Sequence, residues 1–171
     1  MRKLLVVVIL LVMTACSQKF ALDFYQPPPQ RIPKNSAVYV MVPENGRYGN
    51  TTYGNSGQQT AQALFASLSA VTNKIETGLA PESVEAARAT AQSKGSAYIF
   101  QPLILNWEDR ATEWSGIPDK ITIKVIVYDV ESGKDIGSVL GRASSKWGTF
   151  GGDHPQDLLP RIMNEFTKRL F

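Results

Sequence analysis

The sequence has 171 residues, with 18 Lys and Arg, 15 Asp and Glu, and a formal net charge of +3. So small an excess of positive charge gives no support for nucleic-acid binding. A hydrophobic content of 43% with 19% charged residues is typical of one soluble globular domain.

The first 15 residues are predicted to be an export signal. Arg2 and Lys3 form a short positive segment, and residues 4–13 carry no polar side chain. About ten apolar residues match the hydrophobic segment of a signal peptide and are too few to span a bilayer. Small residues then lead to Cys16, an arrangement that resembles the lipobox of bacterial lipoproteins. Cleavage before Cys16 would leave 16 basic against 15 acidic residues, a mature net charge of +1.

Cys16 is the only cysteine, so neither a disulfide nor a cysteine-based metal site can form within one chain. The lipobox resemblance implies that the thiol is acylated, for example by palmitate, and attaches the mature protein to a membrane. Ser17 follows instead of Asp, which by resemblance to sorted lipoproteins implies the outer membrane. Two alternatives remain open: an ordinary signal peptide cut after Ala15, and an uncleaved membrane anchor.

Residues 16–35 are predicted to form a lipidated, proline-rich tether, and residues 36–171 the folded periplasmic domain. Pro27, Pro28, Pro29 and Pro33 favour an extended polyproline conformation that does not pair regularly with strands. The alternative is a segment packed along the domain. Four apolar residues in its first half make that alternative plausible: Phe20, Leu22, Phe24 and Tyr25.

Within the domain, residues 37–42 form an apolar, β-branched run that ends at Pro43 and predicts a strand. The loop over residues 44–57 is rich in Gly and Asn, which tolerate positive φ. Ser56 is placed to cap the helix that follows, with Gln59 as its capping-box partner. The apolar residues of this helix recur at helical spacing and are Ala61, Leu64, Phe65, Leu68 and Val71.

The middle of the chain predicts a strand, a helix and a second strand. A short strand covers residues 74–77. Pro81 then opens a helix that Gly95 stops. The next strand covers residues 97–106, and Pro102 within it predicts an edge or a bulge. The apolar face of the helix is small and consists of Val84, Ala87 and Ala91.

The C-terminal part predicts a hairpin and a final helix. Residues 121–127 alternate between apolar and polar side chains, which predicts a half-buried strand. A turn leads into the last strand, over residues 136–147. Asp153 can cap the final helix with Gln156 as its partner, and Pro160 can mark the true start of that helix. The apolar stripe of the helix is Leu158, Leu159, Ile162, Phe166 and Leu170.

The predicted order is β-α-β-α-β-β-β-α, with parallel pairing early, where helices connect the strands, and hairpins late. We therefore expect an α/β (α+β) fold with a single mixed β-sheet and about three packed helices. The pattern is similar to that of the periplasmic α/β domains of envelope lipoproteins, a likeness of fold that implies no function.

Two longer stretches are more specific: NWEDRATEWSG at residues 106–116 and SKWGTFGGDHPQDLL at residues 145–159. Together with Tyr48-Gly49 and Ser56-Gly57, they resemble a family of Gram-negative lipoproteins described as domain of unknown function 4823. The resemblance covers roughly residues 36–171. It implies an envelope lipoprotein and carries no reaction with it.

These stretches and the glycine-rich loop hold the residues of a candidate binding surface. If the loops meet at one end of the sheet, aromatic rings could stack on a glycan or a protein partner beside charged groups. The alternative is that the tryptophans fill the core and the charges form local ion pairs. The candidate residues are Tyr48, Tyr53, Trp107, Arg110, Glu113, Trp114, Trp147 and Phe150.

Catalysis is not predicted. His154 is the only histidine, which excludes a histidine-rich metal site, and no Gly-x-Ser-x-Gly elbow is present. A Ser-His-Asp arrangement around His154 stays open, with Asp153 or Asp157 as the acid, beside the simpler interpretation of a helix cap. A glycosidase pair stays open beside solvated loop charges and would come from Glu108, Asp109 and Glu113.

The leading hypothesis is a non-catalytic outer-membrane lipoprotein on the periplasmic face, whose domain binds or scaffolds an envelope protein or a glycan. No cofactor, metal or nucleic acid is predicted. One alternative is a hydrolase acting on glycan or peptidoglycan, which requires an open cleft that brings His154 or Glu113 close to other titratable groups. The other alternative is a subunit of a self-assembling envelope complex.

Overall fold

The computed structural model describes residues 19–110, 117–145 and 154–171. In this part of the chain, the strands form a six-stranded and a two-stranded sheet. In chain order the elements are β1 (Lys19–Gln26), β2 (Val38–Val40), β3 (Arg47–Tyr48), β4 (Thr51–Thr52), α2 (Ser56–Leu68), β5 (Ile75–Thr77), α3 (Val84–Ser93), β6 (Tyr98–Glu108), β7 (Lys120–Asp129), β8 (Asp135–Ser144), the 3-10 helix η1 (Pro155–Leu158) and α4 (Leu159–Leu170).

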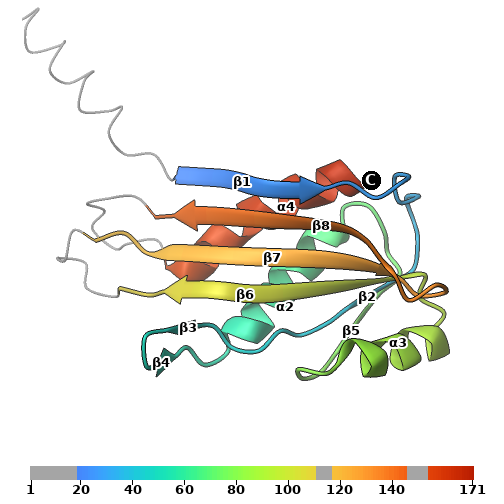
Figure 1. Cartoon of the computed structure of the whole chain (residues 1–171), viewed down its shortest axis with the longest axis horizontal. Helices are drawn as coiled ribbons and strands as arrows, with labels where there is room; N and C mark the ends of the chain where they lie inside the picture. Colours follow the sequence, from blue (N-terminus) through green and yellow to red (C-terminus); the bar gives the residue numbers. More distant parts are fainter. Residues whose placement is uncertain (1–18, 111–116, 146–153) are drawn as a thin grey trace, which may run out of the picture.

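The larger sheet has the strand order β1-β8-β7-β6-β2-β5 (Figure 1). β2 pairs in parallel with β5 and β6, because α2 and α3 carry the chain back across the sheet between these strands. β6, β7 and β8 are antiparallel neighbours, and β1 adds to β8 in the antiparallel sense. The predicted α/β class with one mixed sheet is confirmed, as are early parallel pairing and late hairpins.

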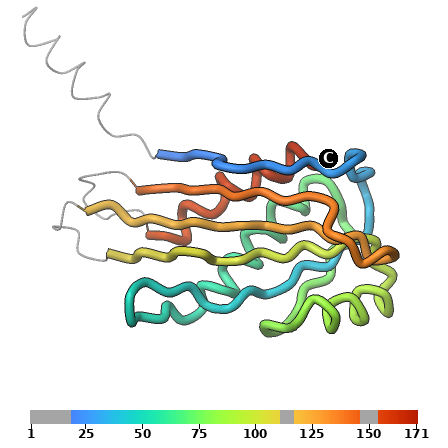
Figure 2. The backbone as a smooth tube through the Cα atoms, in the orientation of Figure 1, coloured from blue at the N-terminus to red at the C-terminus, as the bar shows by residue number. Residues whose placement is uncertain are grey.

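The two faces of the sheet are covered differently. Val38 and Val40 pack in the main core with α2 and α4, whereas Tyr39 and Met41, which point the other way, pack with α3. Thus α2 and α4 cover one face, and α3 packs on β2 and on the start of β6 at one end of the other (Figures 1 and 2). No described helix covers the rest of that second face, over β1, β8 and most of β7 and β6. We call this area the open face.

The predicted apolar patterns of the second half are confirmed. The core-facing Ile and Val residues of β7 are 0–1% exposed, and each contributes about 1.5–3 kcal/mol by leaving water. α4 buries its whole predicted stripe, and its Phe166 meets Phe100 edge-to-face with ring centroids 6.4 Å apart. On α2 the prediction is wrong for Phe65, which is 42% exposed because it lies at the margin of the stripe formed by Leu64 and Leu68.

The predicted tether is wrong for the residues that the structure describes. Residues 19–26 are β1, which pairs along β8 at the edge of the sheet. The Tyr25 hydroxyl donates to the Arg169 carbonyl of α4 at 3.0 Å. Between Pro29 and Pro33, Ile32 is 2% exposed and its N–H donates to the Leu170 carbonyl at 2.9 Å. The packed alternative holds instead, and the domain begins at β1 and not at residue 36.

The start of α2 differs from the predicted capping box. Asn55, with a φ of 65°, precedes the helix, and its side chain does not cap it. The Gly57 N–H of the first turn donates instead to Oδ1 of Asn45 at 3.0 Å. The Ser56 hydroxyl donates to the Tyr53 carbonyl at 2.6 Å and accepts the Gly46 N–H at 2.8 Å. Ser56 therefore closes the loop before the helix, and it does not cap the helix.

At the C-terminal helix, a different pair forms the cap. The N–H of His154 donates to the Asp157 carboxylate at 3.0 Å, so Asp157 takes the place predicted for Gln156. Asp153 lies outside the described residues. Pro160 stands in the first turn of α4, after the 3-10 turn of η1, so the prediction that it marks the helix start is confirmed.

Two further boundaries follow from single residues. α3 begins at Val84 because the Ser83 hydroxyl accepts the Ala86 N–H at 3.2 Å, so the helix starts three residues after Pro81. It ends before Gly95, as predicted, where φ is 71°. Pro102 lies beyond the point where β6 stops pairing with β2, so its missing N–H is tolerated at an open edge, as predicted.

Candidate functional site

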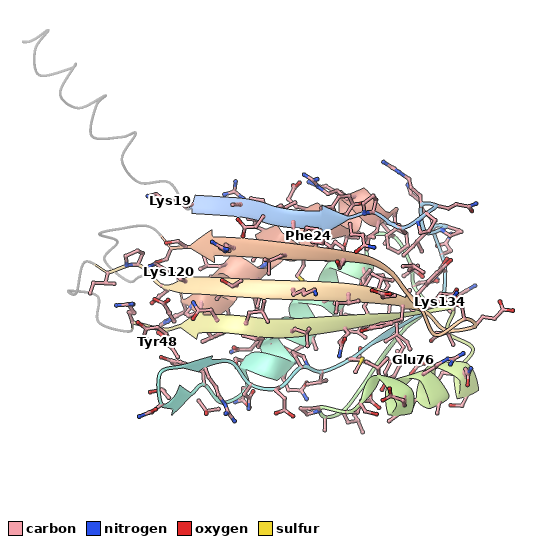
Figure 3. All side chains as sticks on the ribbon, viewed as in Figure 1. Lys19, Phe24, Tyr48, Glu76, Lys120 and Lys134 are labelled. Atoms are coloured by element: carbon pink, nitrogen blue, oxygen red, sulfur yellow. The ribbon has the colours of Figure 1, made fainter. Side chains whose placement is uncertain are left out.

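One end of the large sheet brings together strand ends and loops that are far apart in sequence. We call it the loop end and define it by Lys19, Tyr48, Glu108, Lys120 and Ser144. β6 and β8 finish there, β1 and β7 begin there, and the β3–β4 hairpin lies beside it (Figure 1). Lys19, Tyr48 and Lys120 mark it in Figure 3. The predicted convergence of loops at one end of the sheet is therefore present for the residues described there.

Arg110 is the centre of a hydrogen-bonded group at the loop end. Its Nη2 lies 2.8 Å from the Tyr48 hydroxyl and 2.8 Å from Oε2 of Glu108, and its Nε lies 3.0 Å from the same oxygen. Its Cζ also stands 5.2 Å from the centre of the Tyr48 ring. Asn106 donates to the other Glu108 oxygen at 3.1 Å. The guanidinium is thus held in one orientation beside an exposed aromatic ring.

The environment of Glu108 favours its charged form. Burial raises the pKa of this carboxyl, but the hydrogen bonds from Arg110 and Asn106, together with the positive charge of Lys120, outweigh burial and bring the pKa below its ordinary value. The Glu108 hydrogen bonds also raise the pKa of the Arg110 guanidinium. The pKa of Glu108 is lower in the folded than in the unfolded protein. The ion pair therefore stabilises the fold fully at pH values above the unfolded-state pKa, and this stabilisation is lost as the pH falls through the folded-state pKa.

A polar cavity of about 410 Å³ lies next to this group and is lined by Tyr53, Asp109 and His154, among other residues. The Tyr53 hydroxyl donates to the Asp109 carbonyl at 3.3 Å. Oδ1 of Asp109 is buried, and the structure gives it no hydrogen-bond partner among the described residues. Asp119 accepts the Arg110 N–H at 2.6 Å. Burial, followed by the charge of Asp109, raises the pKa of Asp119.

The structure brings together Tyr48, Tyr53 and Arg110 from the predicted surface, and it corrects one residue. Trp107 is 2% exposed and packs in the main core, so it is no part of a contact surface. Sequence reasoning missed Asp119, because an isolated aspartate in a loop matches no motif. Five predicted residues lie outside the described part of the chain: Cys16, Glu113, Trp114, Trp147 and Phe150.

The described groups at the loop end suit binding better than bond cleavage. His154 does share a cavity with Asp109, but the serine that lines it, Ser56, is 1% exposed and already bonded to backbone on both sides. The pKa of Glu108, one of the glycosidase candidates, lies below its ordinary value, which does not suit a general acid, and both of its carboxylate oxygens already accept hydrogen bonds from Asn106 or Arg110. Among the described residues no group of three His, Cys, Asp or Glu side chains is placed to hold a metal ion.

Sequence comparison finds one family. The family model described as domain of unknown function DUF4823 matches residues 30–170, which confirms the resemblance stated from the two motifs. No curated protein matches the chain significantly. No helix in the described ranges is both long enough and apolar enough to cross a membrane.

Several solved structures share the fold at low sequence identity. The PelC dodecamer from Paraburkholderia phytofirmans has a TM-score of 0.69 and 14% identity, and the match covers 90% of this chain and 97% of that chain. Protein XCC0632 from Xanthomonas campestris has a TM-score of 0.52 and 12% identity over 83% and 87% of the two chains. Lipoprotein GNA1162 from Neisseria meningitidis has a TM-score of 0.51 and 14% identity over 78% and 99%. Identities this low establish a common fold only.

Proposed function

The chain belongs to the family described as domain of unknown function DUF4823, and from this we propose that it is a lipoprotein of the outer membrane, anchored through Cys16. Its periplasmic domain binds or scaffolds another envelope component and catalyses no reaction. The observation that carries the proposal is the position of the sole cysteine, directly after a signal-like apolar segment. The fold shared with a neighbour that is itself a lipoprotein, GNA1162, supports it.

The proposed anchor would lie close to the fold. Lys19, the first residue of β1, comes three residues after Cys16. Covalent geometry limits three residues to about 11 Å. An acylated Cys16 would therefore hold the loop end near the bilayer, and the partner of Tyr48 and Arg110 is then a component in or beside the same membrane.

Replacing Cys16 tests the anchor. For Cys16→Ala we expect an unprocessed chain that begins at Met1 and carries no acyl mass, because the lipobox has lost its nucleophilic sulfur. Wild type is expected to begin at Cys16, carry fatty acyl mass, and fractionate with the outer membrane. Intact-mass analysis of both proteins, purified from membranes, measures this. Ser17→Ala is the matched control and should keep the wild-type mass. An identical mass for Cys16→Ala and wild type would refute the anchor.

Photo-crosslinking in intact cells tests the binding role of the loop end. We expect a benzoylphenylalanine at position 48 to form a discrete crosslinked product, because Tyr48 is 42% exposed beside the fixed Arg110. The same crosslinker at position 134 is the control, since Lys134 lies at the opposite end of the sheet (Figure 3). Equal products from both positions, or none from position 48, would contradict a partner at the loop end.

Self-assembly is a second candidate function, and one observation favours it over the hydrolase. The structure with the TM-score of 0.69 is that of a dodecamer, and the likeness covers almost the whole of both chains. The molar mass of the purified protein in detergent, measured by light scattering with the micelle subtracted, separates a ring of identical subunits from a monomer that binds a different protein.

A further inference from the structure

The open face is hollowed where it reaches the loop end. The hollow has a volume of about 240 Å³ and lies across four neighbouring strands, β1, β8, β7 and β6. Three cationic side chains line it, those of Lys19, Lys120 and Arg142, around the small residues Ala21, Thr122 and Ser144. The lining also includes apolar residues, so a hollow of this kind fits an anionic group that is attached to an apolar body.

Strand register places these cations on one face. Lys19 of β1 and Lys120 of β7 are both paired with Ser144 of β8. Residues directly opposite one another in a sheet share a face, so the two ammonium groups flank Ser144 from strands that are about 10 Å apart. Arg142 stands two residues before Ser144 on the same strand and therefore points to the same side.

Two carboxylates lie near the hollow. Asp23 pairs with the Nε of Arg142 at 2.8 Å and offsets the charge of this arginine, whereas Glu108 pairs at 2.8 Å with Arg110, which does not line the hollow. Lys120 acts on Glu108 through its charge, but Lys120 and Lys19 make no ion pair with any described residue. Both lysines are exposed. The hollow therefore keeps a local excess of positive charge although the mature chain is almost neutral.

Acylation of Cys16 would bring this hollow to a membrane. Lys19 lines it and is three residues from Cys16, so acylation would set the hollow within one or two lipid headgroups of the bilayer surface. Ile117, near the start of β7, adds a side chain that is 48% exposed. An apolar group beside lysines is a combination suited to the interface of a bilayer.

We propose that Lys19, Lys120 and Arg142 bind the phosphate of an anionic phospholipid in the leaflet that holds the anchor. The inference rests on the proposed function, because acylation of Cys16 would hold the hollow close to the bilayer surface. It adds a second membrane contact, which fixes the orientation of the domain, and with it the direction in which Tyr48 and Arg110 face.

Native mass spectrometry of the full chain in a nonionic detergent tests the site. We expect short-chain phosphatidylglycerol to bind in preference to phosphatidylcholine. Lys19→Glu and Lys120→Glu should each weaken phosphatidylglycerol binding by about fivefold or more, the effect of roughly one charge contact with an anionic membrane. Both residues are exposed, so neither change should unfold the domain, and Lys19→Gln and Lys120→Gln should give smaller losses in the same direction. Lys134→Glu makes the same charge change at the opposite end and should alter binding by less than about twofold.

The outcomes separate this site from the anchor. Equal binding of the two lipids, an equal loss in Lys134→Glu, or binding of inorganic phosphate as strong as that of phosphatidylglycerol would overturn the lipid site. The same spectra report acyl mass on Cys16. An acylated chain without lipid preference refutes the site alone, whereas a chain without acyl mass that still prefers phosphatidylglycerol refutes the anchor and retains the site.

Discussion

A chain that begins at residue 36 is expected to lose its cooperative unfolding transition, whereas a chain that begins at Ser17 should retain it. The shorter chain lacks β1 and with it three side chains that pack on the main core, Phe20, Leu22 and Tyr25, as well as the buried Ile32. Ile32 is fully buried and contributes about 1.5–3 kcal/mol, and the three partly buried side chains each contribute less. Together with the lost pairing along β8, this is a large fraction of the stability of a small domain, about 5–15 kcal/mol.

Urea unfolding followed by circular dichroism measures the difference between the two chains. The longer chain is the matched control because it also lacks the export signal and Cys16 but keeps every described residue. Removing β1 also exposes the edge of β8, an unpaired strand that is prone to aggregate. If the two chains unfolded with the same midpoint, residues 17–35 would be a tether after all.

The first strand was difficult to predict because its partner is distant. Phe20, Leu22 and Tyr25 favour a packed segment, but the prolines that follow favour an extended tether. The proline run begins only where β1 ends, so it turns the chain towards the end of α4 and does not interrupt the strand. Phe20 pairs with Ala143, and a contact over so many residues leaves no local signal. The β7 alternation and the α4 stripe were predictable because a single period describes each of them.

The candidate site was predictable to the extent that it depends on strand ends. Tyr48 ends β3 and Arg110 follows β6, and both strands finish at the loop end. The contact between the two residues therefore follows from topology. For Trp107 the alternative of a core position holds, for a different reason. The pairing of β6 with β7 shifts between Ile104 and Asn106, so Leu105 is an extra residue and is 56% exposed. This bulge reverses the alternation and turns Trp107 to the core, and nothing in the sequence beyond Pro102 indicated it.

Trp107→Ala is accordingly expected to lower the free energy of unfolding by about 3–5 kcal/mol, the usual cost of removing a large aromatic side chain from a core. The side chain is fully buried beside Ile121, its register partner. It also packs against Gly46, where an added Cβ would lie 3.0 Å from the Trp107 Cγ, an atom that the alanine variant lacks. Gly46 opens the loop that carries Tyr48, so the truncation should also loosen the contact between Tyr48 and Arg110.

Urea unfolding of Trp107→Ala, Trp107→Phe and Tyr48→Ala separates a core role from a surface role. Trp107→Phe keeps an aromatic ring and should lose clearly less than the alanine variant. Tyr48→Ala removes a ring that is 42% exposed and should cost at most about 1 kcal/mol. If the order were reversed, with Trp107→Ala nearly neutral and Tyr48→Ala severe, Trp107 would return to the contact surface. Such a result would also mean that the bulge at Leu105 does not turn Trp107 to the core.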